Sequence, residues 1–180
     1  MYNFISSICY LFQFIFMYIF SKIFSIDSYN HIIKYGIENY YLGDMQSTKN
    51  LLKNENINLK LVINCTYDLD FYNKNNNNIY YYRIPLSDMN IKKSSEYLEL
   101  NKTKICSDIF NLLNLIKKKE RNEEFSVLFH CRNGTQRSAT CLLLFFYLTY
   151  NYNIINIMKN NRNMVFKPFL FNNLIKNNIK

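Results

Sequence analysis

The sequence predicts a single α/β domain, in which helices flank a central and mostly parallel β-sheet. Short apolar or aromatic segments alternate along the chain with segments of helical periodicity, and this alternation is typical of a parallel sheet covered by helices. The chain has 180 residues, of which 49% are hydrophobic, so it is long enough to bury the core of one domain. We place this domain at residues 28–178, after an apolar N-terminal segment.

The elements are predicted in chain order. Residues 27–40 are mixed in character, and we expect no regular structure there. Segments rich in apolar, β-branched or aromatic residues are predicted strands, and these are 40–42, 59–65, 79–85 and 125–129. Apolar spacing and terminal residues predict helices from Asp44 to about 56, and over 105–119, 138–150, 153–161 and 168–177.

The first 25 residues form a separate apolar segment. No charged residue precedes Lys22, and the stretch from Phe4 to Phe20 is mostly apolar. A basic region before it is missing, which argues against a cleaved signal peptide. Two interpretations stay open, a membrane anchor and a helix packed on the domain. The positive charges follow the segment, so an anchor would leave the domain cytoplasmic. The unpaired cysteines also suit a reducing compartment, so we expect a cytoplasmic domain, with membrane association left open.

Charge and cysteine usage restrict the function classes. The net charge of +9 suits phosphoproteins, phosphoinositides, anionic membranes or RNA as partners, and it equally suits a lysine-rich solvated surface. The five cysteines are odd in number and show no paired spacing, so neither a disulfide framework nor a zinc site is predicted. We expect Cys65 and Cys141 to be core residues.

The segment from Val127 to Ser138 carries the most specific pattern. It runs from a predicted strand through a tight loop into a predicted helix, and Arg137 follows Cys131 by six positions. Gly134, one of three glycines in the chain, lies inside the loop. Backbone N–H groups at such a helix start converge on an anion, and an arginine fork binds two phosphate oxygens. The same positive charge lowers the pKa of a cysteine thiol and makes it a nucleophile.

This segment resembles the His-Cys-x5-Arg-Ser motif of the protein tyrosine phosphatase superfamily. The fixed positions are matched at residues 130, 131, 134, 137 and 138. The resemblance extends over about 38–177: Tyr40 to Gly43 is similar to the opening strand and turn of dual-specificity phosphatase domains, and Tyr82 to Asp88 is similar to the strand that leads to their general-acid loop. The chain contains no tryptophan, which favours the dual-specificity branch.

The resemblance implies a role for each residue of the site. Cys131 attacks phosphorus, Arg137 holds the phosphoryl oxygens, Asp88 acts as the general acid, and Ser138 donates a hydrogen bond to the sulfur. His130 orients the loop. The rest of the loop binds the substrate phosphate through its amides: Arg132, Asn133, Gly134, Thr135 and Gln136. Whether the side chains of Arg132 and Gln136 contact substrate stays open. No cofactor and no metal is implied.

The general acid is the least certain of these assignments. Asp68, Asp70 and Asp108 compete with Asp88, which otherwise is a turn residue after a proline-bounded strand. The polar stretch 89–104 follows Asp88 and shows little periodicity, so we expect an exposed loop at the rim of the site.

The resemblance implies a cysteine-dependent phosphatase that hydrolyses phosphotyrosine and phosphoserine/threonine through a cysteinyl-phosphate, with a phosphorylated protein as its partner. One alternative is a phosphoinositide, phospholipid or RNA 5′ phosphatase of the same superfamily, although nucleic acid is the weakest partner among these. Another is a pseudophosphatase that binds phosphorylated proteins without turnover.

Overall fold

In the computed structural model, residues 28–161 are described, and their fold is an α/β domain. The apolar segment 1–25, Cys9 and the helix predicted at 168–177 lie outside the described residues. The strands are β1 (Tyr29–Tyr35), β2 (Glu38–Gly43), β3 (Leu59–Asn64), β4 (Tyr80–Arg83) and β5 (Phe125–His130). The helices are α2 (Ser47–Leu52), α3 (Ile91–Lys119), α4 (Arg137–Tyr150) and α5 (Ile155–Asn161).

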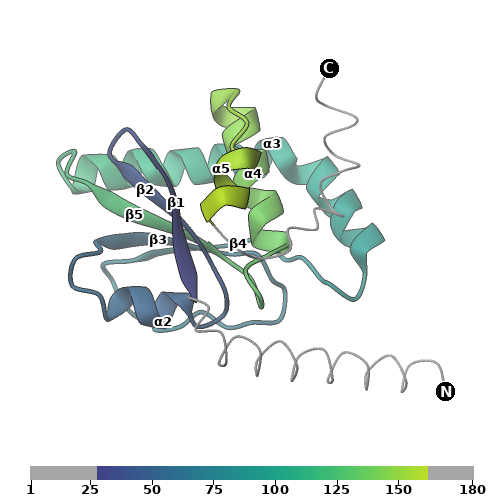
Figure 1. Cartoon of the computed structure of the whole chain (residues 1–180), viewed down its shortest axis with the longest axis horizontal. Coiled ribbons are helices and arrows are strands. Elements are labelled where there is room, and N and C mark those ends of the chain that lie inside the picture. Colours follow the sequence, from purple (N-terminus) through teal and green to yellow (C-terminus); the bar gives the residue numbers. More distant parts are fainter. Residues whose placement is uncertain (1–27, 162–180) are drawn as a thin grey trace.

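The five strands form one sheet in the order β1-β2-β5-β3-β4 (Figure 1). β1 pairs antiparallel with β2, and the other neighbours pair in parallel. The carboxyl ends of β2, β3 and β5 therefore meet at one edge, where His130 pairs with both Gly43 and Asn64. In open α/β sheets this is the edge where ligands bind. The mostly parallel sheet with flanking helices confirms the predicted fold class.

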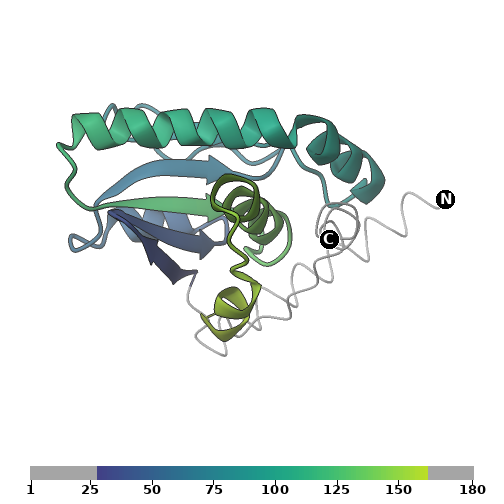
Figure 2. The same ribbon diagram turned by 90° about the horizontal axis from the view of Figure 1, so that it is seen from above.

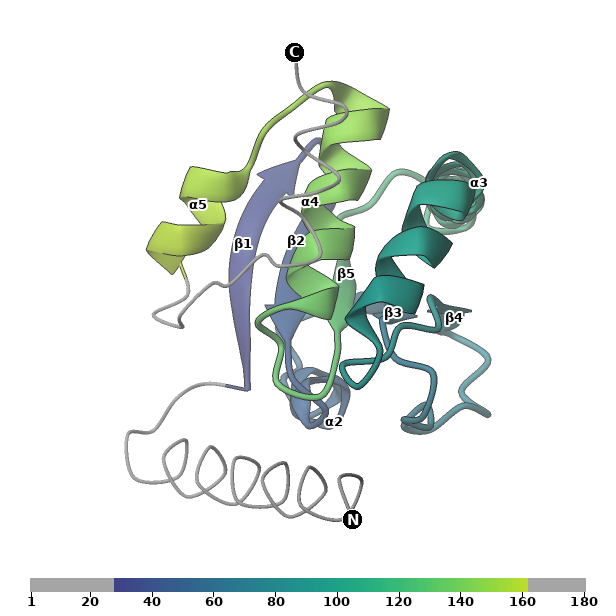
Figure 3. The same cartoon turned by 90° about the vertical axis from the view of Figure 1, so that its right-hand side faces the viewer.

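Helices cover both faces of the sheet. On one face Val127 and Phe129 of β5 pack with residues of α3, α4 and α5, while on the other face Leu128 packs with Leu51 of α2. This alternation follows from the period of two in a strand. Figure 1 shows α2 on the opposite side of the strands from α3. In Figure 3, α4 crosses in front of β2 and β5, and α5 lies beside β1.

The prediction of no regular structure at 27–40 was wrong, because β1 occupies half of it and β2 begins at Glu38. β1 lies at the edge of the sheet, and only Ile32 in it is buried. An edge strand that is mostly exposed shows little hydrophobic alternation, so its sequence gives a weak signal. The turn that joins β1 to β2 contains Gly36 with φ +61°, a conformation that glycine adopts without strain.

The prediction of an exposed loop at 89–104 was also wrong, because α3 begins at Ile91 and runs unbroken to Lys119. The side chain of Asn90 accepts a hydrogen bond from the N–H of Lys93 and caps the helix. Ser94 and Leu98 are buried at helical spacing, ahead of the predicted apolar series that starts at Ile105. Figure 2 shows α3 along one side of the sheet, with its first part set at an angle to the rest.

Candidate active site

The cysteine loop, residues 131–136, connects β5 to α4 at the carboxyl edge of the sheet. Backbone hydrogen bonds fix it on one side: the N–H of Cys131 donates to the carbonyl of Gly43 (3.3 Å), and the N–H of Met45 donates to the carbonyl of Arg132 (3.3 Å). Gly134 adopts φ +65°, where a side chain would be strained. Asn133 is exposed, whereas Thr135 and Gln136 are half-buried.

The sulfur of Cys131 accepts two hydrogen bonds inside this loop. The N–H of Gly134 donates to Sγ at 3.2 Å, and the hydroxyl of Ser138, in the first turn of α4, donates to it at 3.3 Å. Burial raises the pKa of the Cys131 thiol, but the charge of Arg137 and the hydrogen bonds from Ser138 lower it more, so the pKa lies below its usual value. The loop therefore stabilises a thiolate.

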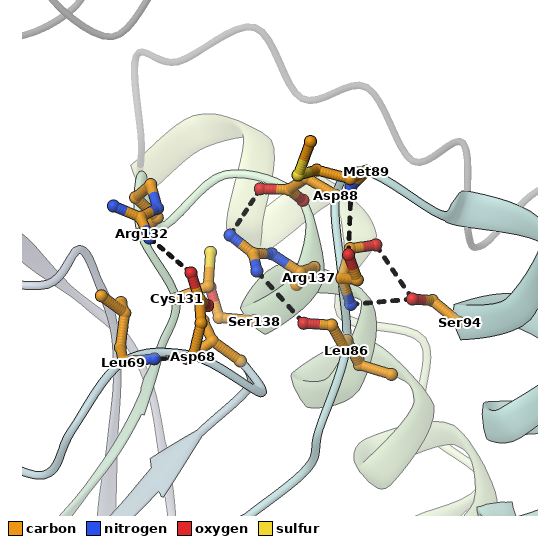
Figure 4. A network of polar contacts seen from close by, with 12 residues as sticks. Asp68, Leu69, Leu86, Asp88, Met89, Ser94, Cys131, Arg132, Arg137 and Ser138 are labelled. Atoms are coloured by element: carbon orange, nitrogen blue, oxygen red, sulfur yellow. Dashed lines mark hydrogen bonds and ion pairs between the residues drawn. The ribbon is translucent and has the colours of Figure 1, made fainter. Parts of the chain in front are cut away.

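Arg137 is the charged residue that lowers the pKa of Cys131 most, and its side chain is only 3% exposed. Its Nη2 lies 2.5 Å from Oδ2 of Asp88, and its Nη1 donates to the carbonyl of Leu86 at 3.2 Å. Figure 4 shows both contacts, with the sulfur of Cys131 close by. A buried guanidinium held in one orientation is the group that binds two oxygens of a phosphate.

Asp88 lies on a loop that α3 anchors. The hydroxyl of Ser94, in the first turn of α3, accepts a hydrogen bond from the N–H of Ser87 (2.8 Å) and donates one to its carbonyl (2.9 Å). Burial raises the pKa of the Asp88 carboxyl, the charges of Arg137 and Arg132 lower it, and the net direction is upward. An acid with a raised pKa is suited to proton donation near neutral pH.

The competing carboxylates lie in different places. Oδ2 of Asp68 is 2.5 Å from Nη2 of Arg132, so Asp68 also lies beside the cysteine loop. Asp108, on α3, instead accepts a hydrogen bond from the hydroxyl of Tyr82 (2.9 Å) and lies 3.5 Å from Nζ of Lys104. Asp70 is exposed on the loop after β3. Of the four carboxylates, Asp88 is the one that contacts Arg137.

His130 ends β5 directly before the nucleophile position, and its side chain is buried. Burial lowers the pKa of its imidazole to about 4, and the charges of Arg83 and Arg137 act in the same direction. The ring is therefore neutral at pH 7. Its role in orienting the loop stays a prediction.

A further network holds the loop after β3, and sequence reasoning did not find it. Asn64 accepts hydrogen bonds from the N–H (3.0 Å) and hydroxyl (2.7 Å) of Thr66, and its amide donates to the carbonyl of Leu69 (2.8 Å). Arg83 donates to the carbonyls of Thr66 (2.8 Å) and Leu69 (2.7 Å). The Asn-x-Thr spacing at the end of a strand is typical of such side-chain turns and is the signal that was available.

Two other features bear on the predictions. Cys65 and Cys141 are buried thiols, and burial raises the pKa of Cys65 well above its usual value, as expected for core residues. Between residues 28 and 161, no helix combines the length and hydropathy that a membrane crossing requires.

The fold agrees with comparisons to known proteins. The family model for the dual specificity phosphatase catalytic domain matches residues 40–177. Human DUSP28 superimposes with a TM-score of 0.59 at 13% identity, covering 84% of this chain and 92% of that one. A mouse putative dual specificity phosphatase complexed with zinc tungstate gives a TM-score of 0.55 at 14% identity, covering 83% and 85%.

A third solved structure, the PTP-2 phosphatase of Cydia pomonella, gives a TM-score of 0.53 at 16% identity and covers 83% of this chain and 89% of that one. No curated protein matches the sequence. Because the family model spans most of the chain, this protein belongs to the dual specificity phosphatase family.

Proposed function

We propose that this protein is a cysteine-dependent protein phosphatase, which hydrolyses phosphotyrosine and phosphoserine/threonine through a cysteinyl-phosphate at Cys131. The observation that carries this proposal is the environment of the Cys131 sulfur, which accepts hydrogen bonds from Gly134 and Ser138 beside the buried Arg137. One structure thus stabilises the attacking thiolate and offers positive charge to the phosphoryl group. Membership of the family supports phosphatase chemistry.

In the first step the thiolate attacks phosphorus in line with the leaving oxygen. The S–P bond forms while the P–O bond to the substrate breaks, and Asp88 transfers its proton to the leaving oxygen. Arg137 and the loop amides hold the three equatorial oxygens, where charge must be stabilised. In the second step water attacks phosphorus, Asp88 accepts its proton, and the S–P bond breaks. The hydrogen bond from Ser138 stabilises the departing thiolate.

The ion pair between Asp88 and Arg137 suggests how substrate binding prepares the acid. Without substrate, the carboxylate of Asp88 is a partner of the Arg137 guanidinium at 2.5 Å. A bound phosphate dianion takes over that guanidinium and leaves Asp88 beside like charge. Like charge raises the pKa of a carboxyl group, so binding favours the protonated form that the first step needs.

The first test is the release of 4-nitrophenol from 4-nitrophenyl phosphate by the full chain. We expect turnover by the wild type, none by Cys131→Ser, and a kcat about 100-fold lower for Asp88→Asn, because general acid catalysis contributes about this much. Asp108→Asn is the matched control, since Asp108 contacts Tyr82 and Lys104 and not the cysteine loop. A folded wild type without turnover would contradict the proposal and favour a phosphate-binding module.

The pH dependence of kcat/KM gives a second prediction. Activity requires the Cys131 thiolate, so it falls on the acidic side, and the lowered pKa of Cys131 extends activity toward low pH. It also requires protonated Asp88, so it falls on the basic side, and the raised pKa of Asp88 extends activity toward high pH. We expect Ser138→Ala to move the acidic limb to higher pH, and Asp88→Asn to abolish the basic limb. Unmoved limbs in both variants would contradict these assignments.

A further inference from the structure

The arginine inside the cysteine loop is paired with a carboxylate on the loop after β3. Arg132 follows Cys131 directly, and its Nη2 lies 2.5 Å from Oδ2 of Asp68, with the two side chains 34% and 30% exposed. In Figure 4, Asp68 and Asp88 approach the loop from different segments of the chain, and each contacts a different arginine. The carboxylate of Asp68 therefore compensates the positive charge of Arg132 beside the cysteine loop.

Asp68 is held more firmly than an ordinary surface carboxylate. It lies between Thr66 and Leu69, whose carbonyls both accept hydrogen bonds from Arg83 and whose backbone is also bonded to Asn64. The N–H of Leu69 donates to the hydroxyl of Thr66 as well (3.1 Å). Because the loop is fixed beforehand, the pair with Arg132 loses less entropy on forming than a typical exposed ion pair does.

The pair of Asp68 and Arg132 affects which substrate groups can bind beside the transferred phosphate. When a substrate phosphate replaces Asp88 at Arg137, Asp88 stays near Arg132 and its partner Asp68. A second phosphate or a carboxylate near the scissile group meets the charge of Asp68, and a basic group is attracted by it. The net charge of +9 for the whole chain does not describe this local balance.

Apolar side chains accompany both carboxylates. Tyr67, before Asp68, is 55% exposed, and Met89, after Asp88, is 65% exposed. The N–H of Tyr67 donates to the carbonyl of Leu86 (3.2 Å), which joins the two loops next to each other. Exposed aromatic and methionine side chains suit the side chains of a peptide better than they suit an inositol ring covered with hydroxyl and phosphate groups.

We propose that Asp68 is a specificity-determining residue that directs the site toward a single phosphate on a peptide with basic flanking residues, and away from polyanionic substrates. The inference rests on the proposed function and names its substrate class. Asp68 acts partly through Arg132, which it neutralises and orients, and partly through its own charge.

The test compares two phosphotyrosine peptides of equal length, one with lysines and one with glutamates on both sides of the phosphotyrosine. We expect the full-length wild type to have an about tenfold higher kcat/KM for the lysine peptide at low salt, and Asp68→Asn to reduce this ratio about fivefold. Asp68→Glu retains the charge and is expected to keep most of the preference. Asp70→Asn removes the same charge two residues along the loop and is expected to leave the ratio nearly unchanged.

The wild type alone supplies a second measurement, because the preference is expected to shrink as salt rises toward 1 M. Equal kcat/KM for both peptides, a ratio that Asp68→Asn does not alter, or faster hydrolysis of a dispersed short-chain phosphatidylinositol bisphosphate than of the lysine peptide would each overturn this inference. In the first two cases turnover of 4-nitrophenyl phosphate still supports the proposed function, and in the third it supports only the cysteine-dependent chemistry and favours a lipid substrate. Absence of that turnover overturns both.

Discussion

At the residue scale, Arg137 connects the groups of the site to one another. Its guanidinium contacts Asp88 and the carbonyl of Leu86, and its charge lowers the pKa of both Cys131 and His130. Because it is almost fully buried, water screens this charge little. The Cys131 thiol, the proposed acid Asp88 and the buried imidazole of His130 are therefore all expected to respond to whatever binds Arg137.

His130 gives a specific prediction of how the free energy of unfolding depends on pH. Its folded pKa of about 4 lies below the value of about 6.5 expected in the unfolded chain. Between these values the unfolded state binds the proton and the folded state does not, so the free energy of unfolding decreases as pH falls from about 6.5 to about 4, by about 3 kcal/mol. Urea unfolding at pH 7 and pH 4.5 measures this difference.

The control for His130 is His130→Asn, which has no group that titrates in this range. It is expected to lose most of the pH dependence that His130 contributes, whatever its stability at pH 7. If wild type and variant lose the same free energy of unfolding on acidification, the imidazole is not the cause.

The cysteine loop was predictable because its residues are close in sequence. Cys131, Gly134, Arg137 and Ser138 lie within one strand, loop and helix start, so local geometry brings them together. The pair of Asp68 and Arg132 was not predictable in this way, because its partners are 64 positions apart. Only the parallel pairing of β3 with β5 places the loops after them side by side.

At the element scale, β2 and α2 meet at Gly43 with almost no space. A Cβ added at Gly43 would overlap Cβ and Oγ of Ser47, the first residue of α2, and would also approach the carbonyl of Ser28 at 3.1 Å. The carbonyl of Gly43 accepts a hydrogen bond from the N–H of Cys131. The close approach therefore positions a helix and the cysteine loop together.

We predict that Gly43→Ala lowers the free energy of unfolding by about 2 kcal/mol, because overpacking a tight contact costs about 1–3 kcal/mol. It is also expected to lower kcat/KM, since displacement of β2 moves the acceptor of the Cys131 N–H. Urea unfolding measures the first effect. The double variant Gly43→Ala/Ser47→Gly removes the overlapping atoms and is expected to cost less than the sum of the single changes; simple additivity would contradict the steric explanation.

The helices show where sequence patterns fail. The part of α3 that contains Ile105 and Ile109 was predicted, because buried apolar residues recur there at helical spacing. Its first turns were not, because Ser94 is buried for its hydrogen bonds to Ser87 and carries no apolar signal. In the sequence alone, a helical polar residue such as Ser94 that anchors a neighbouring loop cannot be distinguished from a residue of the loop itself.

At the scale of the whole molecule, the cysteine loop and the ion pairs of α3 lie at opposite edges of the sheet. The carboxyl edge carries the cysteine loop, and ion pairs join α3 to the opposite edge. Glu38, 2% exposed at the start of β2, lies 2.7 Å from Nζ of Lys117, and Lys60 of β3 lies 2.9 Å from Glu120. The ion pairs that join α3 to the sheet therefore lie away from the proposed chemistry.

This separation predicts that Lys117→Met lowers the free energy of unfolding by about 2–3 kcal/mol, because Glu38 is left buried without its countercharge. The double variant Glu38→Gln/Lys117→Met is expected to recover part of this loss. Chemical unfolding of the four proteins in the cycle measures the coupling. A kcat/KM that falls in parallel with stability would contradict the separation of the two edges.

The backbone hydrogen bonds at Gly43 and Arg132 affect which residues of the cysteine loop can be substituted. Bonds between main-chain atoms do not depend on which side chains the loop carries, so replacing Asn133, Thr135 or Gln136 is expected to leave these two bonds in place. Under the proposed function, substitutions at these three positions are expected to alter substrate preference while Cys131 keeps its position.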